Sequence, residues 1–221
     1  MTMAEARRHH ADGQLWSSHG GSRDMYRGTG RGPATISIVI DTTDMRRLAA
    51  QYGQAFETMT KGRAALSRTI NVGLRKLNTE LKYKVKEWTG IRVVGEVTKG
   101  FRNTWSTPAT LVGRLRVEDR HRVLSRKMFG ASWSRGNPGG THHAWNRGQI
   151  AVGSFMQPSQ QSLMKRVGTA RKPIKPLYGP NFAREIERHR PEVQARVTVV
   201  TAAVQREGLA LLRLALSGSR R

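Results

Sequence analysis

Residues 66–88, LSRTINVGLRKLNTELKYKVKEW, carry the clearest structural pattern in the chain. Apolar side chains recur there every three or four residues, which is the repeat of one face of an α-helix. These apolar positions are Leu66, Ile70, Leu74, Leu77, Leu81, Val85 and Trp88. The opposite face collects basic residues seven positions apart, among them Arg68, Arg75 and Lys82. The stretch therefore predicts a long amphipathic helix with a basic outer face, ending at Gly90.

Upstream of this helix the sequence predicts a strand and a second helix. Ile36, Ile38 and Ile40 alternate with other residues, which is the period of a β-strand. Residues 41–44 offer helix N-caps, and apolar residues at helical spacing follow as far as residue 59. We expect Lys61-Gly62 to break or kink the chain between this helix and the basic one.

Short apolar runs predict β-structure in the middle of the chain. They cover 91–97, 111–117 and 149–156, and Arg114, Arg116, Arg120 and Arg122 would share one strand face. The Gly-rich stretch 130–148 is expected to be a long loop. Residues 191–216 predict a C-terminal helix, although the β-branched run 197–201 leaves a strand open there.

The N-terminal residues 1–33 differ in composition from the rest. They hold Gly, His and Arg without an apolar period, which predicts an extended, mobile arm. Residues 34–221 are expected to form a single α+β domain, in which an antiparallel sheet packs with the long basic helix and the C-terminal helix.

Charge is the strongest feature of the composition. The 221 residues include 39 Lys and Arg against 15 Asp and Glu, for a formal net charge of +24. With such a surplus, the positive charges of the chain repel each other and attract polyanions or acidic surfaces. The chain has no Cys, so disulfides, thiolate metal sites and cysteine nucleophiles are excluded. It has no long apolar run and no secretory signal pattern, so we expect a soluble, cytoplasmic product.

No motif in the sequence indicates catalysis. Glu118-Asp119 and Glu185 with Glu187 are the only close acidic groups, and local ion pairs with neighbouring Arg account for them. The doublet His142-His143 has a faint similarity to HNH nucleases but lacks the further Asn and His that the motif needs. A metal-dependent nuclease is therefore the least favoured alternative. We expect no enzyme activity, no metal and no cofactor.

Three basic clusters remain to be explained. They are the outer face of the basic helix, residues 114–127, and residues 165–175, the last with Lys165, Arg166, Arg171, Lys172 and Lys175. Such clusters can neutralise phosphates, with binding that falls steeply as salt rises. They can equally bind acidic surfaces of sister subunits. Aromatic residues make up 6% of the chain and do not interleave the basic helix, so stacking on nucleic-acid bases is not indicated.

The chain resembles the minor tail protein Z family of tailed bacteriophages and prophages. The similarity extends over about Leu66–Ile186 and rests on residues 153–156, 163–168 and, most specifically, 171–180. Ser154 and Asn181 stand where Ala and Ser are common in the family. The residues of an expected signature turn are Arg171, Pro173, Ile174, Leu177, Tyr178, Gly179 and Pro180. In such a turn Pro fixes φ and Gly permits positive φ.

This resemblance implies a structural virion protein at the head-proximal end of a phage tail. Such a tail-completion or neck protein forms a ring that terminates the tail tube and supports head–tail joining. The implied partners are copies of itself in a hexameric ring, the tail terminator, tail-tube and neck or connector proteins, and, non-specifically, DNA passing through the lumen. No membrane partner is implied. The implied location is the tail or neck of the virion, and the host cytoplasm during assembly.

The expected interface residues follow from the same resemblance. They are the signature turn, the basic helix face of Arg68, Arg75 and Lys82, and the arm 1–33, which would clamp a neighbouring subunit. The alternative is a general nucleic-acid-binding basic protein of ribosomal or chromatin type, which the high positive charge favours.

Overall fold

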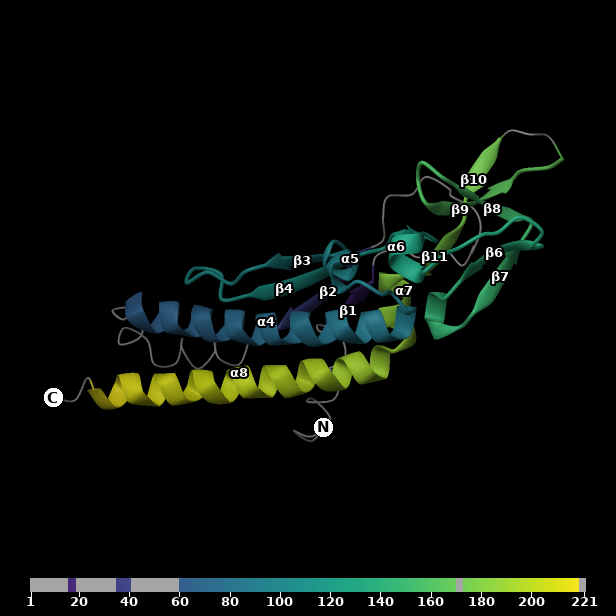
Figure 1. Cartoon of the computed structure of the whole chain (residues 1–221). Coiled ribbons are helices and arrows are strands. Elements are labelled where there is room, and N and C mark those ends of the chain that lie inside the picture. Colours follow the sequence, from purple (N-terminus) through teal and green to yellow (C-terminus); the bar gives the residue numbers. More distant parts are fainter. Residues whose placement is uncertain (1–15, 19–34, 41–59, 170–172, 219–221) are drawn as a thin grey trace, which may run out of the picture. The chain divides into compact units, whose positions relative to one another are not determined.

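A computed structural model describes residues 16–18, 35–40, 60–169 and 173–218 of the chain (Figure 1). It is an α+β protein with antiparallel sheets and two long helices, as the sequence predicts. We expected one domain over 34–221, whereas contacts divide the chain into two compact units. The helix–sheet unit holds the described residues up to Glu80, Arg102–Val117 and those from Arg190 onward. The strand-rich unit holds Leu81–Phe101 and Glu118–His189.

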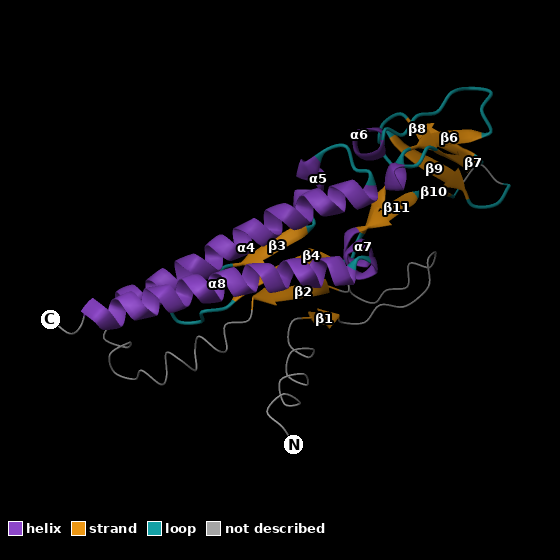
Figure 2. Cartoon of the chain, turned by 90° about the horizontal axis from the view of Figure 1, so that it is seen from below, coloured by secondary structure: helices purple, strands orange, loops and turns teal. Residues whose placement is uncertain are grey.

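The helix–sheet unit packs two long helices on one sheet (Figure 2). The helices are α4 (Thr60–Thr89), which ends in the other unit, and α8 (Arg190–Gly218). The sheet has the order β1-β2-β4-β3, and the strands are β1 (Trp16–Ser18), β2 (Thr35–Ile40), β4 (Gly113–Glu118) and β3 (Phe101–Thr104). Both figures show α4 and α8 side by side over the same face of the sheet.

The core of this unit follows from the predicted apolar stripe of α4. Leu66, Ile70, Leu74 and Leu77 are all buried, as are Val193, Val197, Val200 and Val204 of α8. Strand β4 lies directly on α4, because a Cβ added at Gly113 would be 3.1 Å from Ile70 Cγ2. The predicted basic helix is therefore confirmed. Lys61 and Gly62 lie in the first turn of α4 as described, and the residues before Thr60, which would show a break from a preceding helix, lie outside the described residues.

Other predictions in this unit have mixed outcomes. Strand β2 is confirmed, and α8 confirms the C-terminal helix, because its valines bury at helical spacing and so exclude the strand alternative. The helix expected before residue 60 and most of the arm 1–33 lie outside the described residues. Three residues of that arm form β1, which pairs antiparallel with β2 and places Trp16 opposite Ile38.

The strand-rich unit contains three small antiparallel sheets, of order β10-β9-β8, β11-β5 and β6-β7. Its strands are β5 (His121–Val123), β6 (Gly139–His142), β7 (Gln149–Val152), β8 (Ser154–Gln157), β9 (Ser162–Arg166), β10 (Ile174–Pro176) and β11 (Tyr178–Asn181). Its other helices are α5 (Val94–Thr98), α6 (Arg126–Phe129), the 3₁₀ turn η1 (Ala144–Asn146) and α7 (Phe182–Arg188). Within the described part of the chain, no helix is both long and apolar enough to cross a membrane.

Three sequence predictions in this unit are corrected by the structure. The run 91–97 is not a strand but leads into α5, because its apolar residues do not alternate and only Ile91 and Val97 are buried. The run 149–156 is two strands, divided at Gly153, whose φ is +74°. Arg120 and Arg122 do not share the face of Arg114 and Arg116, because β4 ends at Glu118.

The stretch 130–148 is not a long loop. Residues 139–142 form β6 and pair with β7, from Gly139 opposite Val152 to His142 opposite Gln149. A Cβ on Gly139 would lie 2.0 Å from the carbonyl oxygen of Ala151, so glycine is required for this close pairing. In the sequence Asn137-Pro138-Gly139-Gly140, the two glycines are therefore the first residues of β6.

Gly73 tests the helix packing directly. A Cβ at this position of α4 would lie 2.4 Å from Val204 Cγ2 and 3.3 Å from Val200 Cγ1. We expect Gly73→Val to lower the free energy of unfolding by about 1–3 kcal/mol, as overpacking does, in a urea titration. Adding Val204→Ala should recover part of the loss. Gly95→Ala is the control, since its Cβ would meet only Val93 at 3.9 Å. An unchanged midpoint for Gly73→Val would contradict the close helix contact.

Candidate functional site

The segment that carries the family resemblance is extended, so the predicted turn is wrong. Ile174–Pro176 form β10 and pair with β9, and Tyr178–Asn181 form β11 and pair with β5. Between these strands, Leu177 N donates to Leu163 O and Leu177 O accepts from Leu124 N, both at 2.9 Å. The segment is therefore a continuous strand run that joins two sheets.

The signature residues differ in what they expose. Gly179 and Pro180 are buried, Ile174 and Leu177 are half-buried, and Pro173 is exposed. Tyr178 is 57% exposed, which makes it the large apolar side chain of the segment that is open to a partner. Arg171 lies outside the described residues.

Gly179 is needed for space and not for a positive φ. It does not belong to the glycines with positive φ among the described residues. A Cβ there would lie 2.6 Å from Leu124 Cδ2, so a larger residue would have to displace the buried Leu124 side chain. Sequence reasoning identified the right residue but the wrong physical reason.

The two positions that depart from the family pattern have defined roles. Asn181 caps α7, since its side-chain oxygen accepts from Ala183 N at 3.0 Å and from Arg184 N at 3.4 Å. Ser and Asn are both strong N-caps, so Asn in place of Ser preserves this function. Buried Ser154 accepts from Gly140 N at 2.9 Å and donates to Ala151 O at 2.6 Å. These bonds tie β8 to the β6–β7 hairpin.

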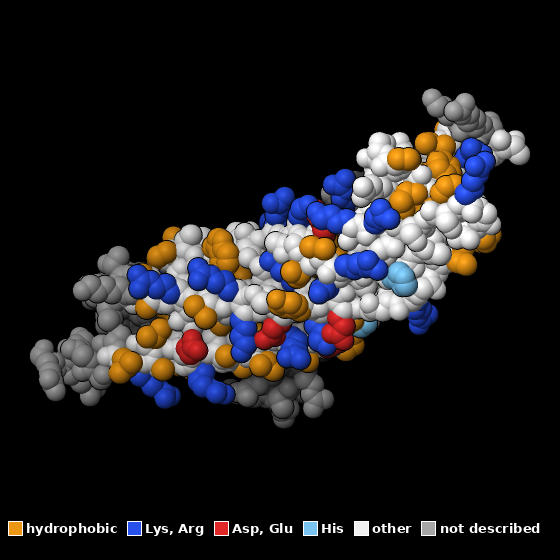
Figure 3. Space-filling view, in the orientation of Figure 1, with side chains coloured by type: hydrophobic (Ala, Val, Ile, Leu, Met, Phe, Trp, Pro, Cys, Tyr) orange, Lys and Arg blue, Asp and Glu red, His pale blue; other side chains and the backbone are white. Residues whose placement is uncertain are grey.

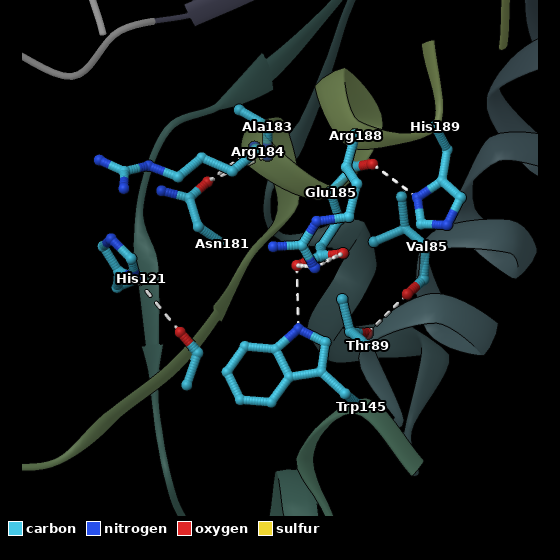
Figure 4. A network of polar contacts seen from close by, with 11 residues as sticks. Val85, Thr89, His121, Trp145, Asn181, Ala183, Arg184, Glu185, Arg188 and His189 are labelled. Carbon is cyan, nitrogen blue, oxygen red and sulfur yellow. Dashed lines mark hydrogen bonds and ion pairs between the residues drawn. The ribbon is translucent and has the colours of Figure 1, made fainter. Parts of the chain in front are cut away.

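A buried polar network stabilises the strand-rich unit (Figure 4). Glu185 is only 3% exposed, and its carboxylate accepts from Trp145 Nε1 at 2.9 Å and from Arg188 Nη1 at 3.1 Å. His189 Nδ1 is 2.9 Å from Glu185 O, and the His189 ring stacks on Trp88 with centroids 4.1 Å apart. The buried charge is thus paired and hydrogen-bonded, as a buried carboxylate in a folded chain requires.

The network holds a strained backbone. Trp145 and Asn146 both have φ of +56°, a conformation that costs about 1–3 kcal/mol for a non-Gly residue. Trp145 is held by Glu185, and Asn146 Nδ2 donates to Glu87 O at the end of α4. Gly90 leaves room for this contact, since a Cβ there would lie 2.6 Å from Asn146 N. Sequence reasoning missed the network, because residues 40 positions apart give no local signal.

The two residues of the histidine doublet differ in their burial. His142 is 5% exposed, and its pKa is lowered by burial and, to a smaller extent, by the nearby His143, which is exposed. Among the described residues there is no group of three His, Asp or Glu side chains that could hold a metal ion. The nuclease interpretation therefore finds no ligand set in this part of the chain.

The predicted basic helix face has three different environments. Arg68 and Arg75 are exposed in the helix–sheet unit, and the Arg75 guanidinium lies 5.5 Å from the ring centroid of Trp105. Arg63 Nε donates to Pro108 O at 2.8 Å and ties the segment that carries Trp105 to α4. Lys82, in the strand-rich unit, is half-buried, and burial lowers its pKa. Arg68 and Arg75 are thus the members of the face that solvent reaches freely.

The longest stretch of the chain without an acidic residue runs from residue 120 to residue 184. Its Lys and Arg residues are Arg120, Arg122, Arg126, Lys127, Arg135, Arg147, Lys165, Arg166, Arg171, Lys172, Lys175 and Arg184. In Figure 3, no acidic side chain is visible on the surface formed by β8, β9 and β10. The basic clusters are evident from the sequence. The absence of Asp and Glu between them is equally a property of the sequence, and a count of acidic residues along the chain identifies it.

Comparisons with protein-family models, with curated proteins and with solved structures found no match. The evidence for a function is therefore the motif resemblance, together with the positive charge of the surface and its exposed side chains.

Trp145→Phe tests the buried network. The change keeps the ring but removes the indole N–H from the Glu185 carboxylate, and an under-satisfied buried charge costs about 1–3 kcal/mol. We expect a loss of that size in the free energy of unfolding. Trp133→Phe, at a position that is 42% exposed, should leave stability nearly unchanged. Equal effects of the two substitutions would contradict the anchoring role.

His142 gives the stability a defined pH dependence. Its pKa is lower in the folded chain than the ordinary 6.5, so protonation favours the unfolded chain. Its contribution is complete above pH 6.5 and is lost as the pH falls from 6.5 toward the folded pKa. We expect His142→Gln to reduce the fall in Tm across this window and His143→Gln to leave most of it. A Tm raised by added divalent metal, and lost with either substitution, would instead favour the nuclease interpretation.

Proposed function

We propose that the chain is a structural tail-completion protein, which assembles as a homo-oligomeric ring at the head-proximal end of a phage or prophage tail. One observation carries this proposal. The segment that resembles the minor tail protein Z family is rigidly built into two sheets, yet it presents Tyr178 to solvent. A fixed backbone with one open aromatic side chain is suited to binding a neighbouring subunit.

The buried groups support a structural role. Glu185 is used to hold Trp145 and Arg188, and His142 is buried in β6. Neither is arranged as an acid or base beside an open site.

The charge also favours an assembly that includes anionic partners. Copies with a formal charge of +24 repel each other unless acidic surfaces or DNA compensate. Tail-tube and neck proteins, together with DNA in the lumen, would supply this compensation at a tail junction. The proposed location is accordingly the virion tail or neck.

The second candidate is a general nucleic-acid-binding protein. The absence of acidic residues between 120 and 184 favours it, because such a stretch attracts phosphates wherever it is exposed. The two functions can be distinguished by protein–protein association. Tail completion requires specific binding to other copies of the chain or to tail proteins, whereas general nucleic-acid binding does not.

Light scattering of the purified chain tests the proposal. We expect an oligomer whose mass is the same at about 50 and about 200 mM salt, a range in which phosphate binding changes strongly. A ring that forms only on addition of tail-tube protein would also support it. A monomer under all these conditions, which binds DNA at low salt and releases it at high salt, would favour the second candidate.

Tyr178→Ala tests the interface itself. Buried aromatic anchors contribute about 2 kcal/mol or more to an interface, so the substitution should weaken association by about 30-fold or more without lowering Tm. Tyr83→Ala is a matched control, because Tyr83 on α4 is 59% exposed and Tyr178 is 57% exposed. Weakening by both substitutions alike, or by neither, would contradict a specific role for Tyr178.

A further inference from the structure

Two lysines face each other directly in the sheet β10-β9-β8. Lys165 of β9 and Lys175 of β10 are partners in the antiparallel register, and both are exposed. Since partners in such a register point to the same face, their side chains leave the sheet side by side. Ser154 of β8 is the next partner of Lys165, so the row across the sheet is lysine, lysine and serine.

This pairing is unfavourable in the isolated chain. Like charges directly opposite each other on neighbouring strands destabilise a sheet. The stretch 120–184 has no carboxylate to separate them, and neither lysine forms an ion pair with another described residue. Arg166, the next residue of β9, points to the opposite face, where its guanidinium lies 5.6 Å from the Phe155 ring centroid. An anion that binds between the two lysines would relieve this repulsion.

We propose that the Lys165–Lys175 pair is a contact site for the phosphate backbone of duplex DNA. Two ammonium groups on adjacent strands can donate to the oxygens of one phosphate without reading the base sequence. The proposal deepens the proposed function by assigning its DNA contact to a particular sheet, and it rests on that function only for the choice of DNA as the polyanion.

The composition of the sheet favours phosphate over an acidic protein partner. The centres of protein interfaces are depleted in Lys and enriched in aromatic residues. In the described strands β8, β9 and β10 the one aromatic side chain is Phe155, which is half-buried and lies on the face opposite the lysine pair. Phosphate backbones are bound by such cationic surfaces, and the resulting affinity depends steeply on salt.

Lys175→Glu is the most informative variant. It converts a repulsive cross-strand pair into an attractive one, so we expect Tm to rise. The same change should weaken binding of a fluorescein-labelled duplex, followed by anisotropy from about 50 to about 200 mM salt. The double variant K165Q/K175Q removes two phosphate contacts and should reduce the slope of log K against log salt by about 1.8. A higher Tm with lower affinity cannot arise from misfolding.

The double variant K76Q/R206Q is the matched control. It also removes two exposed cations, from α4 and α8, and should keep a slope close to that of the unmodified chain. Equal slopes for the two double variants would overturn the proposal, as would binding of poly-glutamate in preference to the duplex. These outcomes are independent of the mass measurement. If the chain forms a ring but the K165Q/K175Q variant binds DNA as the unmodified chain does, the proposed lysine site is wrong and tail completion still stands. If the chain is a monomer that binds DNA through Lys165 and Lys175, tail completion is wrong and the lysine site still stands.

Discussion

Burial of the apolar stripe on α4 is the interaction on which the rest of the structure depends. Its first half packs against β4 and α8 in the helix–sheet unit, where Gly73 and Gly113 leave room for close contact. Its last residues belong to the core of the strand-rich unit, where Trp88 stacks on His189 and Gly90 admits the strained turn of Asn146. One helix thus supplies apolar surface to both units. With that face buried, the basic residues on its other side remain at the surface.

The positive charge of the surface is then a constraint that folding does not remove. Ion pairs such as those of Glu96 with Lys99 and Lys127 neutralise a few sites, and the carboxylates lower the effective charge locally. Between residues 120 and 184, however, no acidic side chain is available. The basic side chains of this stretch therefore remain available to an anionic partner. The repulsion between Lys165 of β9 and Lys175 of β10 is the clearest single example, because the two residues are direct partners in the sheet. The proposed ring around DNA, closed through contacts such as Tyr178, would satisfy both the charge and the open aromatic residue.

Periodicity predicted the elements whose burial follows a regular repeat. The α4 stripe, the alternating isoleucines of β2 and the helical valines of α8 were all predicted, because each repeat reflects one buried face. Two of the wrong predictions involve strands whose partners lie outside the stretch that was interpreted. The expected turn at 173–180 is extended because Leu177 bonds to Leu163 and Leu124, and the expected loop at 130–148 pairs with β7. Likewise, nothing near Glu185 in the sequence identifies Trp145 as its donor. Counting charges predicted a polyanionic or acidic partner, but only the strand register placed Lys165 opposite Lys175.

The central claim is that this chain is a component of a tail junction, and the most direct test is to locate it in a particle. Gold-labelled antibodies against the purified chain can be imaged by electron microscopy on virions produced by a host that expresses it. The account predicts label at one position, the junction of head and tail, on most particles and none along the tail shaft. Label that is absent from intact particles but follows nucleic acid released from broken ones would contradict it.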